Sequence, residues 1–168
     1  MTEASSSASQ TYEGCQTLFS DFALVVSGTQ LKCHKVILAK NSDFFEALLR
    51  NEGDVDTMEV TGGFSLDTVK GFLEYLYSKV EWMPESEAPK RQFDKKKLTP
   101  ELLRLADMYQ AQTLKAACVA HLEKSLTDEN VVDVWVIAER CGGLEELRKQ
   151  ALYYIVKKRD GMTSLPGK

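Results

Sequence analysis

The fold is decided by residues 21–45, which read DFALVVSGTQLKCHKVILAKNSDFF. The unbroken apolar run Phe22–Val26 predicts a buried strand, because it is short and stops at the turn-forming residues Ser27-Gly28-Thr29. The alternation of polar and apolar residues in Gln30–Cys33 predicts the returning strand of a hairpin, with one face on the core. A two-stranded hairpin is only marginally stable alone, so other elements must cover it.

Two short helices are expected directly after the hairpin. The first spans Lys35–Lys40 and the second Asp43–Arg50, where Ser42 suits the N-cap position. Beyond a polar loop at 51–56, Met58–Val60 predicts a short, edge-like strand. Strands that gather early in the chain and are followed by helices favour the α+β class over alternating strands and helices.

The rest of the chain is expected to be mostly helical. Ser65 is a plausible N-cap, and the apolar residues that follow it recur at i, i+3, i+4, i+7 and i+8. Residues 79–97 lose this pattern and predict an exposed insertion, after which Thr99-Pro100 predicts a helix start. Three further helices are expected: one carrying Leu114, Ala117, Cys118, His121 and Leu122 on its apolar side, one from Thr127-Asp128 to Gly142-Gly143, and one over 144–158 with Leu147, Ala151 and Ile155 buried.

Length and charge narrow the classes of protein. A chain of 168 residues fits one compact domain with a small appendage. Its 21 basic and 25 acidic residues give a net charge of -4, which argues against broad contact with nucleic acid or anionic membrane and favours protein partners. Residues 1–11 lack the features of a signal peptide and predict a disordered leader. No apolar run approaches the ~20 residues of a membrane helix, so a soluble protein without a membrane partner is expected.

The cysteines and histidines do not form a recognisable catalytic or metal-binding pattern. The four cysteines lack C-x-x-C spacing, and we interpret them as reduced thiols of a cytoplasmic or nuclear protein. His34 follows Cys33, but neighbouring strand residues point to opposite faces. His121 falls on the apolar side of a helix and predicts a hydrogen-bonded core histidine. We therefore predict no enzyme activity, metal or cofactor, and we interpret the basic runs at 95–97 and 157–159 as solvated surface.

The same residues resemble the signature of the BTB/POZ family. Asp21 precedes the first strand, His34-Lys35 opens a helix, and Ser42-Asp43-Phe44-Phe45 starts the next. The similarity continues through Tyr75-Leu76-Tyr77 and Leu102–Tyr109. The region from Leu126 to Ile155 resembles the paired-helix extension, called three-box or BACK-like, of cullin-binding adaptors, especially the speckle-type MATH–BTB proteins. The resemblance implies a small β-sheet flanked by a cluster of α-helices, laid out as a leader at 1–11, a BTB/POZ domain at 12–126 with its insertion at 79–97, a helical extension at 127–159 and a tail at 160–168.

The resemblance implies a homodimeric protein-interaction module that acts as substrate adaptor of a cullin-RING E3 ubiquitin ligase. It assigns the dimer interface to Leu18, Phe19, Phe22, Val36 and Ile37. It assigns contacts with the N-terminal domain of the cullin scaffold to Leu49, Arg50, Asn51, Glu52, Val55, Asp56, Tyr109, Val132 and Val136. One departure stands out, because strong cullin binders carry a bulky apolar residue, any residue and then glutamate in the loop that corresponds to residues 51–56. That loop has no such triplet and is shorter, which implies weaker or differently built cullin binding.

A second function fits the same family. Asp21 and Lys35 match a charged pair at the dimer groove of transcriptional relatives, where it binds corepressor peptides. The alternative is therefore a dimerising transcriptional regulator, unless the pair is only a surface salt bridge. A channel-type tetramerisation domain is a more distant third reading. Nothing in these residues identifies a substrate.

Overall fold

The computed structural model describes residues 19–52, 54–79 and 93–163, with side chains as far as Arg159. The chain forms two compact units, which divide between Phe93 and Asp94. The predicted leader and most of the insertion predicted at 79–97 lie outside the described residues. Among the described residues, no helix is both long enough and apolar enough to span a membrane.

The first unit contains a three-stranded sheet in the order β2-β1-β3. The predicted hairpin is confirmed: β1 (Phe22–Val26) pairs antiparallel with β2 (Thr29–Cys33). Ser27 and Gly28 have φ values of 48° and 83°, which suits the tight turns that join antiparallel strands. The strand predicted near Met58 is also confirmed as β3 (Thr57–Glu59), which lies at an edge of the sheet and runs parallel to β1.

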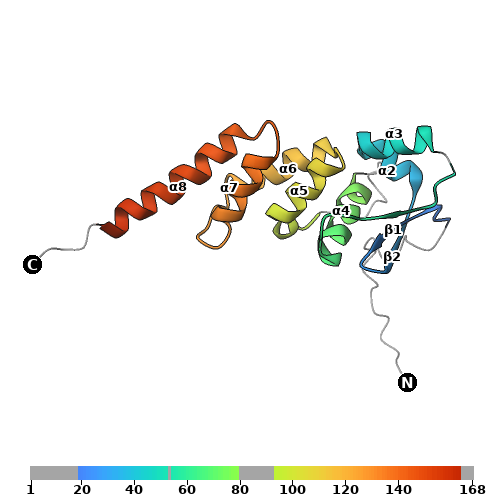
Figure 1. Cartoon of the computed structure of the whole chain (residues 1–168), viewed down its shortest axis with the longest axis horizontal. Coiled ribbons are helices and arrows are strands. Elements are labelled where there is room, and N and C mark those ends of the chain that lie inside the picture. Colours follow the sequence, from blue (N-terminus) through green and yellow to red (C-terminus); the bar gives the residue numbers. More distant parts are fainter. Residues whose placement is uncertain (1–18, 53, 80–92, 164–168) are drawn as a thin grey trace, which may run out of the picture. The chain divides into compact units, whose positions relative to one another are not determined.

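Three helices complete the first unit: α2 (Lys35–Asn41), α3 (Asp43–Asn51) and α4 (Leu66–Ser78). α2 packs against both α3 and α4 (Figure 1). The predicted N-caps are confirmed, since the Ser42 and Ser65 hydroxyls accept hydrogen bonds from the Phe45 and Thr68 amides, each at 3.2 Å. These caps satisfy amide groups that the first helical turn leaves without partners.

The core of the first unit lies between the sheet and these helices. Phe45 is fully buried and meets the Phe22 ring edge-on at 6.3 Å between centroids. The other fully buried side chains come from both strands and helices, so the elements share one apolar core. They include Leu24, Cys33, Leu38, Val69, Phe72, Leu73 and Leu76.

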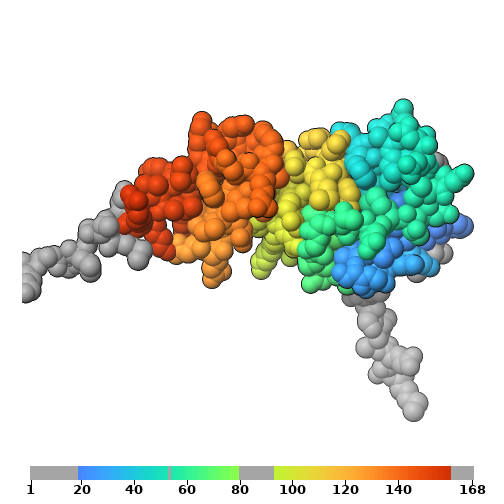
Figure 2. All heavy atoms as spheres, in the orientation of Figure 1, coloured from blue at the N-terminus to red at the C-terminus, as the bar shows by residue number. Residues whose placement is uncertain are grey.

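The second unit is helical. After a single 3-10 turn, η1 (Lys95–Lys97), come α5 (Pro100–Met108), α6 (Gln112–Leu122), α7 (Val131–Arg140) and α8 (Glu145–Thr163). The predicted start of α5 is confirmed, because the Thr99 hydroxyl accepts from the Leu102 amide at 3.2 Å. α5 packs on α6 and α7, and α8 packs along α7, as the orange and red surfaces of Figure 2 show.

Four local expectations in the second unit were wrong. α7 begins at Val131 rather than at Thr127, because the Asn130 side chain accepts from the Thr127 amide at 2.8 Å and donates to the Ser125 carbonyl at 2.9 Å. Such side-chain bonds offer the backbone an alternative to helix. α8 continues past 158 to Thr163. The side chains of Ile155 and His121 are half-buried rather than in the core.

Candidate partner-binding surfaces

Exposed apolar side chains mark one surface of the first unit. Phe19 is 93% exposed just before β1, and Val36 is 71% exposed on α2. Ile37, the next residue along α2, is half-buried. We call Phe19, Val36 and Ile37 the α2 surface. Large apolar side chains with this much solvent exposure are typical of a surface that another protein covers.

The remaining residues assigned to the dimer interface lie elsewhere. Phe22 belongs to the core of the unit and is 3% exposed, so little of its side chain is left for a partner. Its position follows from β1, where all residues but one are buried. Leu18 lies outside the described residues.

Charged groups connect the segment before β1 to the start of α2. The Asp21 carboxylate accepts a hydrogen bond from the backbone amide of Lys35 at 2.8 Å. The Lys35 ammonium donates to Asp56 Oδ1, also at 2.8 Å. Lys35 is only 22% exposed and Asp56 76%, so this ion pair lies at the edge of the unit. Asp21 and Lys35 are thus in contact, as the sequence suggested. The contact is made by the main-chain amide of Lys35 rather than by its ammonium, which pairs with Asp56.

A second surface lies at the end of α3, where six residues assigned to cullin contact are close together. Two backbone hydrogen bonds shape the turn, from the Glu52 amide to the Leu48 carbonyl at 2.8 Å and from the Val55 amide to the Glu52 carbonyl at 3.1 Å. Four of the six side chains are exposed and two, Leu49 and Val55, are half-buried. We call this set the α3-end patch; it consists of Leu49, Arg50, Asn51, Glu52, Val55 and Asp56.

The other residues assigned to cullin contact lie in the second unit and differ in accessibility. Tyr109, at the end of α5, is only 4% exposed, and burial raises the pKa of its hydroxyl to about 12. On α7, Val132 is 57% exposed and Val136 is half-buried. The opposite side of α7 holds the buried Val131 and Val134.

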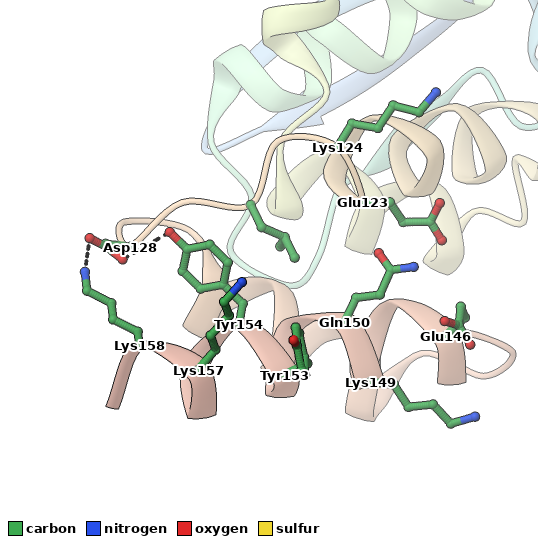
Figure 3. Close-up of a pocket in the computed structure, with 11 residues that line it drawn as sticks. Glu123, Lys124, Asp128, Glu146, Lys149, Gln150, Tyr153, Tyr154, Lys157 and Lys158 are labelled. Carbon is green, nitrogen blue, oxygen red and sulfur yellow. Dashed lines mark hydrogen bonds and ion pairs between the residues drawn. The ribbon is translucent and has the colours of Figure 1, made fainter. Parts of the chain in front are cut away.

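A groove of about 950 Å³ lies between α8 and the loop that precedes α7 (Figure 3). Asp128, in the loop, forms an ion pair with Lys158 and accepts a hydrogen bond from the Tyr154 hydroxyl at 3.2 Å. The Lys158 contact lowers the pKa of this exposed carboxyl. Sequence patterns do not reveal this groove, because it depends on how α8 folds back along α7.

The described residues do not gather a catalytic or metal-binding constellation. Burial raises the pKa of Cys33 and of Cys118 to about 12, and burial is also the largest cause that raises the pKa of Cys141 to about 11, so none of these free thiols is ionised near neutral pH. His34 Nδ1 lies 2.6 Å from the Tyr77 hydroxyl, a hydrogen bond between α2 and α4. In the part of the chain that the structure describes, there is no group of three metal-ligating side chains.

Comparison with known families decides the class of protein. The model of the BTB/POZ domain family matches residues 13–126. The chain belongs to the BTB/POZ family. The α+β arrangement of the first unit, with α5 and α6, which the match also covers, is therefore a BTB/POZ fold, as the sequence predicted. BTB/POZ domains are protein-interaction modules, so the exposed surfaces above are candidate contacts with other proteins rather than sites of reaction.

Relatives of this BTB/POZ chain include protein maternal effect lethal 26 of Caenorhabditis elegans, 28% identical over 174 residues that cover 98% of the chain and 41% of that protein. TD and POZ domain-containing protein 5 of Mus musculus is 30% identical over 141 residues, 83% of the chain and 38% of the relative. Kelch-like protein 6 of Homo sapiens is 24% identical over 84% of the chain and 21% of its own length. The chain thus spans less than half the length of each of these relatives.

Solved structures similar to this BTB/POZ chain include the BTB domain of human gigaxonin, with a TM-score of 0.46 and 21% identity over 64% of the chain and 81% of that structure. The BTB domain of zebrafish PATZ1 matches with a TM-score of 0.48 and 21% identity, over 64% of the chain and 78% of that structure.

Proposed function

We propose that this chain is a homodimeric substrate adaptor of a cullin-RING ubiquitin ligase, and that it performs no chemistry itself. The observation that carries the proposal is the α3-end patch. Its side chains project from a turn fixed by main-chain hydrogen bonds, and none of the six is fully buried. A firmly held turn with mixed apolar and charged side chains suits a partner that brings complementary groups.

The α2 surface supports pairing with a second copy of the chain. Phe19 lies two residues before Asp21 and Val36 directly follows Lys35, so the contact between Asp21 and Lys35 joins the two segments that carry these exposed apolar side chains. Covering them would remove apolar area from water, which is favourable at about 25 cal/mol per Å². A two-fold contact buries the same residues on both copies.

The dimer would carry two cullin contacts, one for each copy. A substrate held by both halves of such a ligase would be captured with avidity, provided that both contacts can be made at once. The working compartment that we propose is the cytoplasm or the nucleus. The free, buried thiols Cys33, Cys118 and Cys141 are compatible with a reducing environment.

Titration of the full chain with a cullin N-terminal domain tests the proposal. Arg50→Glu reverses a 76%-exposed charge in the patch, whose partner Glu46 lies on the same helix, so the fold should be unaffected. We expect binding to weaken at least about tenfold, equal to about 1.4 kcal/mol. Lys124→Glu, at an exposed residue just past α6, is the matched control and should bind as the unmodified chain does.

A second pair of variants tests the assigned residues of the second unit, one on α7 and one at the end of α5. Val132→Asp changes a 57%-exposed side chain and should weaken cullin binding without loss of fold. Tyr109→Phe removes only a hydroxyl, so it separates a direct contact from the role of this buried ring in packing. If the unmodified chain does not bind the cullin domain at any accessible concentration, the adaptor proposal is wrong.

The contacts of Asp21 and Lys35 support the corepressor alternative less well than the adaptor function. The Asp21 carboxylate already accepts from a main-chain amide, and the Lys35 ammonium is already bound to Asp56. A corepressor peptide at the dimer groove would therefore have to displace these contacts to reach the Asp21 carboxylate and the Lys35 ammonium. Strong binding of a corepressor peptide, abolished by Lys35→Glu, would reverse this preference.

A further inference from the structure

Helix α8 has an exposed side that α7 does not cover. Leu147 and Ala151 are buried in the hairpin that α7 and α8 form. Leu152, Tyr153 and Val156 remain 49%, 67% and 40% exposed. Single exposed apolar residues are common on protein surfaces, but three large ones within two turns of one helix indicate a contact with another molecule.

These apolar residues lie on one stripe of α8 that begins and ends with a lysine. Its positions follow the i, i+3, i+4, i+7, i+8 spacing of a single helix side, and all five side chains are exposed. The two lysines are about 12 Å apart along the helix axis. We call this set the α8 stripe; it consists of Lys149, Leu152, Tyr153, Val156 and Lys157.

Positive charge dominates this part of α8, although the whole chain carries a net charge of -4. Residues 147–159 include five basic side chains and not one acidic side chain. Arg148 and Lys158 are paired with carboxylates of other segments. Lys149 and Lys157 form no ion pair within the described part of the chain. The α8 stripe therefore offers two lysines to an acidic partner.

The lysines of the α8 stripe adjoin both its apolar residues and the groove beside α8. Lys157 Nζ lies 6.0 Å from the centre of the Tyr153 ring, within the range of a cation–π contact. Lys149, Tyr153 and Lys157 line the groove between α8 and the loop before α7 (Figure 3). The carboxylates of Glu123 and Glu146 also line this groove, but neither residue lies between the two lysines of the stripe. A partner would thus find an apolar centre with a cation at each end.

We propose that the α8 stripe binds an acidic amphipathic helix of a different protein. Its carboxylates would meet Lys149 and Lys157, and its apolar side chains would cover the residues between them. Carboxylates about eight residues apart on a helix match the spacing of the two lysines. The contact involves only the second unit and does not depend on the adaptor function. One helix laid on another buries less than the roughly 1,000 Å² of a standard stable interface, so binding would be weak.

The charges of the α8 stripe favour this partner over a second copy of the chain. If two stripes packed their apolar residues together, lysine would face lysine whether the helices ran parallel or antiparallel. The helix dipole does not account for the pattern either. Cations gain from the dipole only near the end of a helix, whereas Lys149 is the fifth of the nineteen residues of α8.

Fluorescence anisotropy with a labelled, alanine-rich helical peptide of about 16 residues tests the proposal. The acidic probe carries glutamate at i and i+8 and leucine at i+3, i+4 and i+7. The basic probe has lysine in place of both glutamates and is otherwise the same. We expect the full chain to bind the acidic probe at least about tenfold more tightly than the basic probe, and added salt to reduce the difference.

Charge reversal on the chain gives the decisive comparison. The double variant Lys149→Glu/Lys157→Glu should prefer the basic probe, because each probe then meets the opposite charge. Leu152→Asp should weaken binding of the acidic probe at least about tenfold, as loss of a central apolar contact should. Lys95→Glu/Lys96→Glu, at two exposed lysines of η1, is the matched control and should keep the original preference. A chain that binds neither probe at about 300 μM, or a preference that survives the reversal, would overturn the proposal.

Two further measurements identify a different occupant of the α8 stripe. In a Val36→Asp background, which removes the contribution of the α2 surface, we expect no self-association through α8 in sedimentation velocity. Self-association that Leu152→Asp abolishes would assign the stripe to a second copy and overturn the proposal. We also expect no cosedimentation with vesicles of phosphatidylserine and phosphatidylcholine. Vesicle binding that Lys149→Glu/Lys157→Glu abolishes would assign the stripe to an anionic membrane instead.

Discussion

The Asp21 carboxylate accepts a hydrogen bond from the backbone amide of Lys35 at 2.8 Å. Lys35 is the first residue of α2, and the N-cap residue His34 makes no side-chain cap bond. The carboxylate therefore serves as the missing cap, supplied by a residue that lies before β1. Because an acid near the start of a helix also suits the helix dipole, this contact fixes the segment before β1 on α2.

Removal of this distant cap should lower the stability of the first unit. We expect Asp21→Ala to reduce the free energy of unfolding by about 1 kcal/mol, the usual effect of losing an N-cap side chain. Asp21→Asn should keep most of this stability, because the side-chain amide oxygen of asparagine can also accept the hydrogen bond from the Lys35 amide. Urea denaturation followed by circular dichroism measures both. Asp54→Ala, at an exposed carboxylate in the turn after α3, is the control, and equal midpoints for the two alanine variants would contradict the capping role.

Phe45 should be far more sensitive to truncation than its neighbour Phe44. Its ring is fully buried and meets both Phe22 and Phe44 edge-on, at 6.3 and 5.3 Å between centroids. Phe45→Ala should cost about 3–5 kcal/mol in unfolding free energy, because it leaves a cavity. Phe44→Ala should cost clearly less, since Phe44 is only half-buried. A similar loss for the two variants in chemical denaturation would show that Phe45 is not central to the core.

The parts of the fold that the sequence predicted are those set by neighbouring residues. A serine hydroxyl that caps a helix bonds an amide three residues ahead, as Ser42 and Ser65 do. The turn at Gly28 is equally local. The start of α7 was misplaced because Asn130 bonds back to residues 125 and 127, which competes with helix in a way that residue preferences do not reveal.

The site was only partly predictable because its contacts join distant residues. Family resemblance paired Asp21 with Lys35 and assigned Asp56 to cullin contact, whereas Asp56 is the partner of the Lys35 ammonium. Asp56 is brought there by the parallel pairing of β3 with β1, where the Ala23 amide donates to the Asp56 carbonyl at 2.9 Å.

Val36 offers a direct test of pairing through the α2 surface. Val36→Asp places a charge at a 71%-exposed position, so it should leave the thermal midpoint nearly unchanged. It should convert a dimer into a monomer at micromolar concentration, because burying an unpaired carboxylate at the interface is unfavourable. Light scattering coupled to size exclusion measures the mass. Val132→Asp, at a 57%-exposed valine on α7, is the matched control and should stay dimeric.

Alkaline pH should destabilise the chain through its buried thiols. Burial raises the pKa of Cys33 and Cys118 from the ordinary 9.0 to about 12. Between pH 9 and 12 the unfolded chain therefore loses protons that the native chain keeps, so the free energy of unfolding falls as pH rises through this range. Below pH 9 both states keep the protons, and these thiols cause no pH dependence.

The comparison that isolates the thiols uses the double variant Cys33→Ala/Cys118→Ala. Lysines and tyrosines also titrate at high pH, but they are the same in both proteins and cancel in the difference. Between pH 8 and 10 the unmodified chain should lose more unfolding free energy than the double variant, by on the order of 1 kcal/mol per thiol. Urea denaturation of each protein at pH 8 and at pH 10 gives the four unfolding free energies that the comparison requires. An identical pH dependence in the two proteins would mean that the thiols are not protected from ionisation. The packing around Cys33 in β2 would then be looser than its full burial indicates.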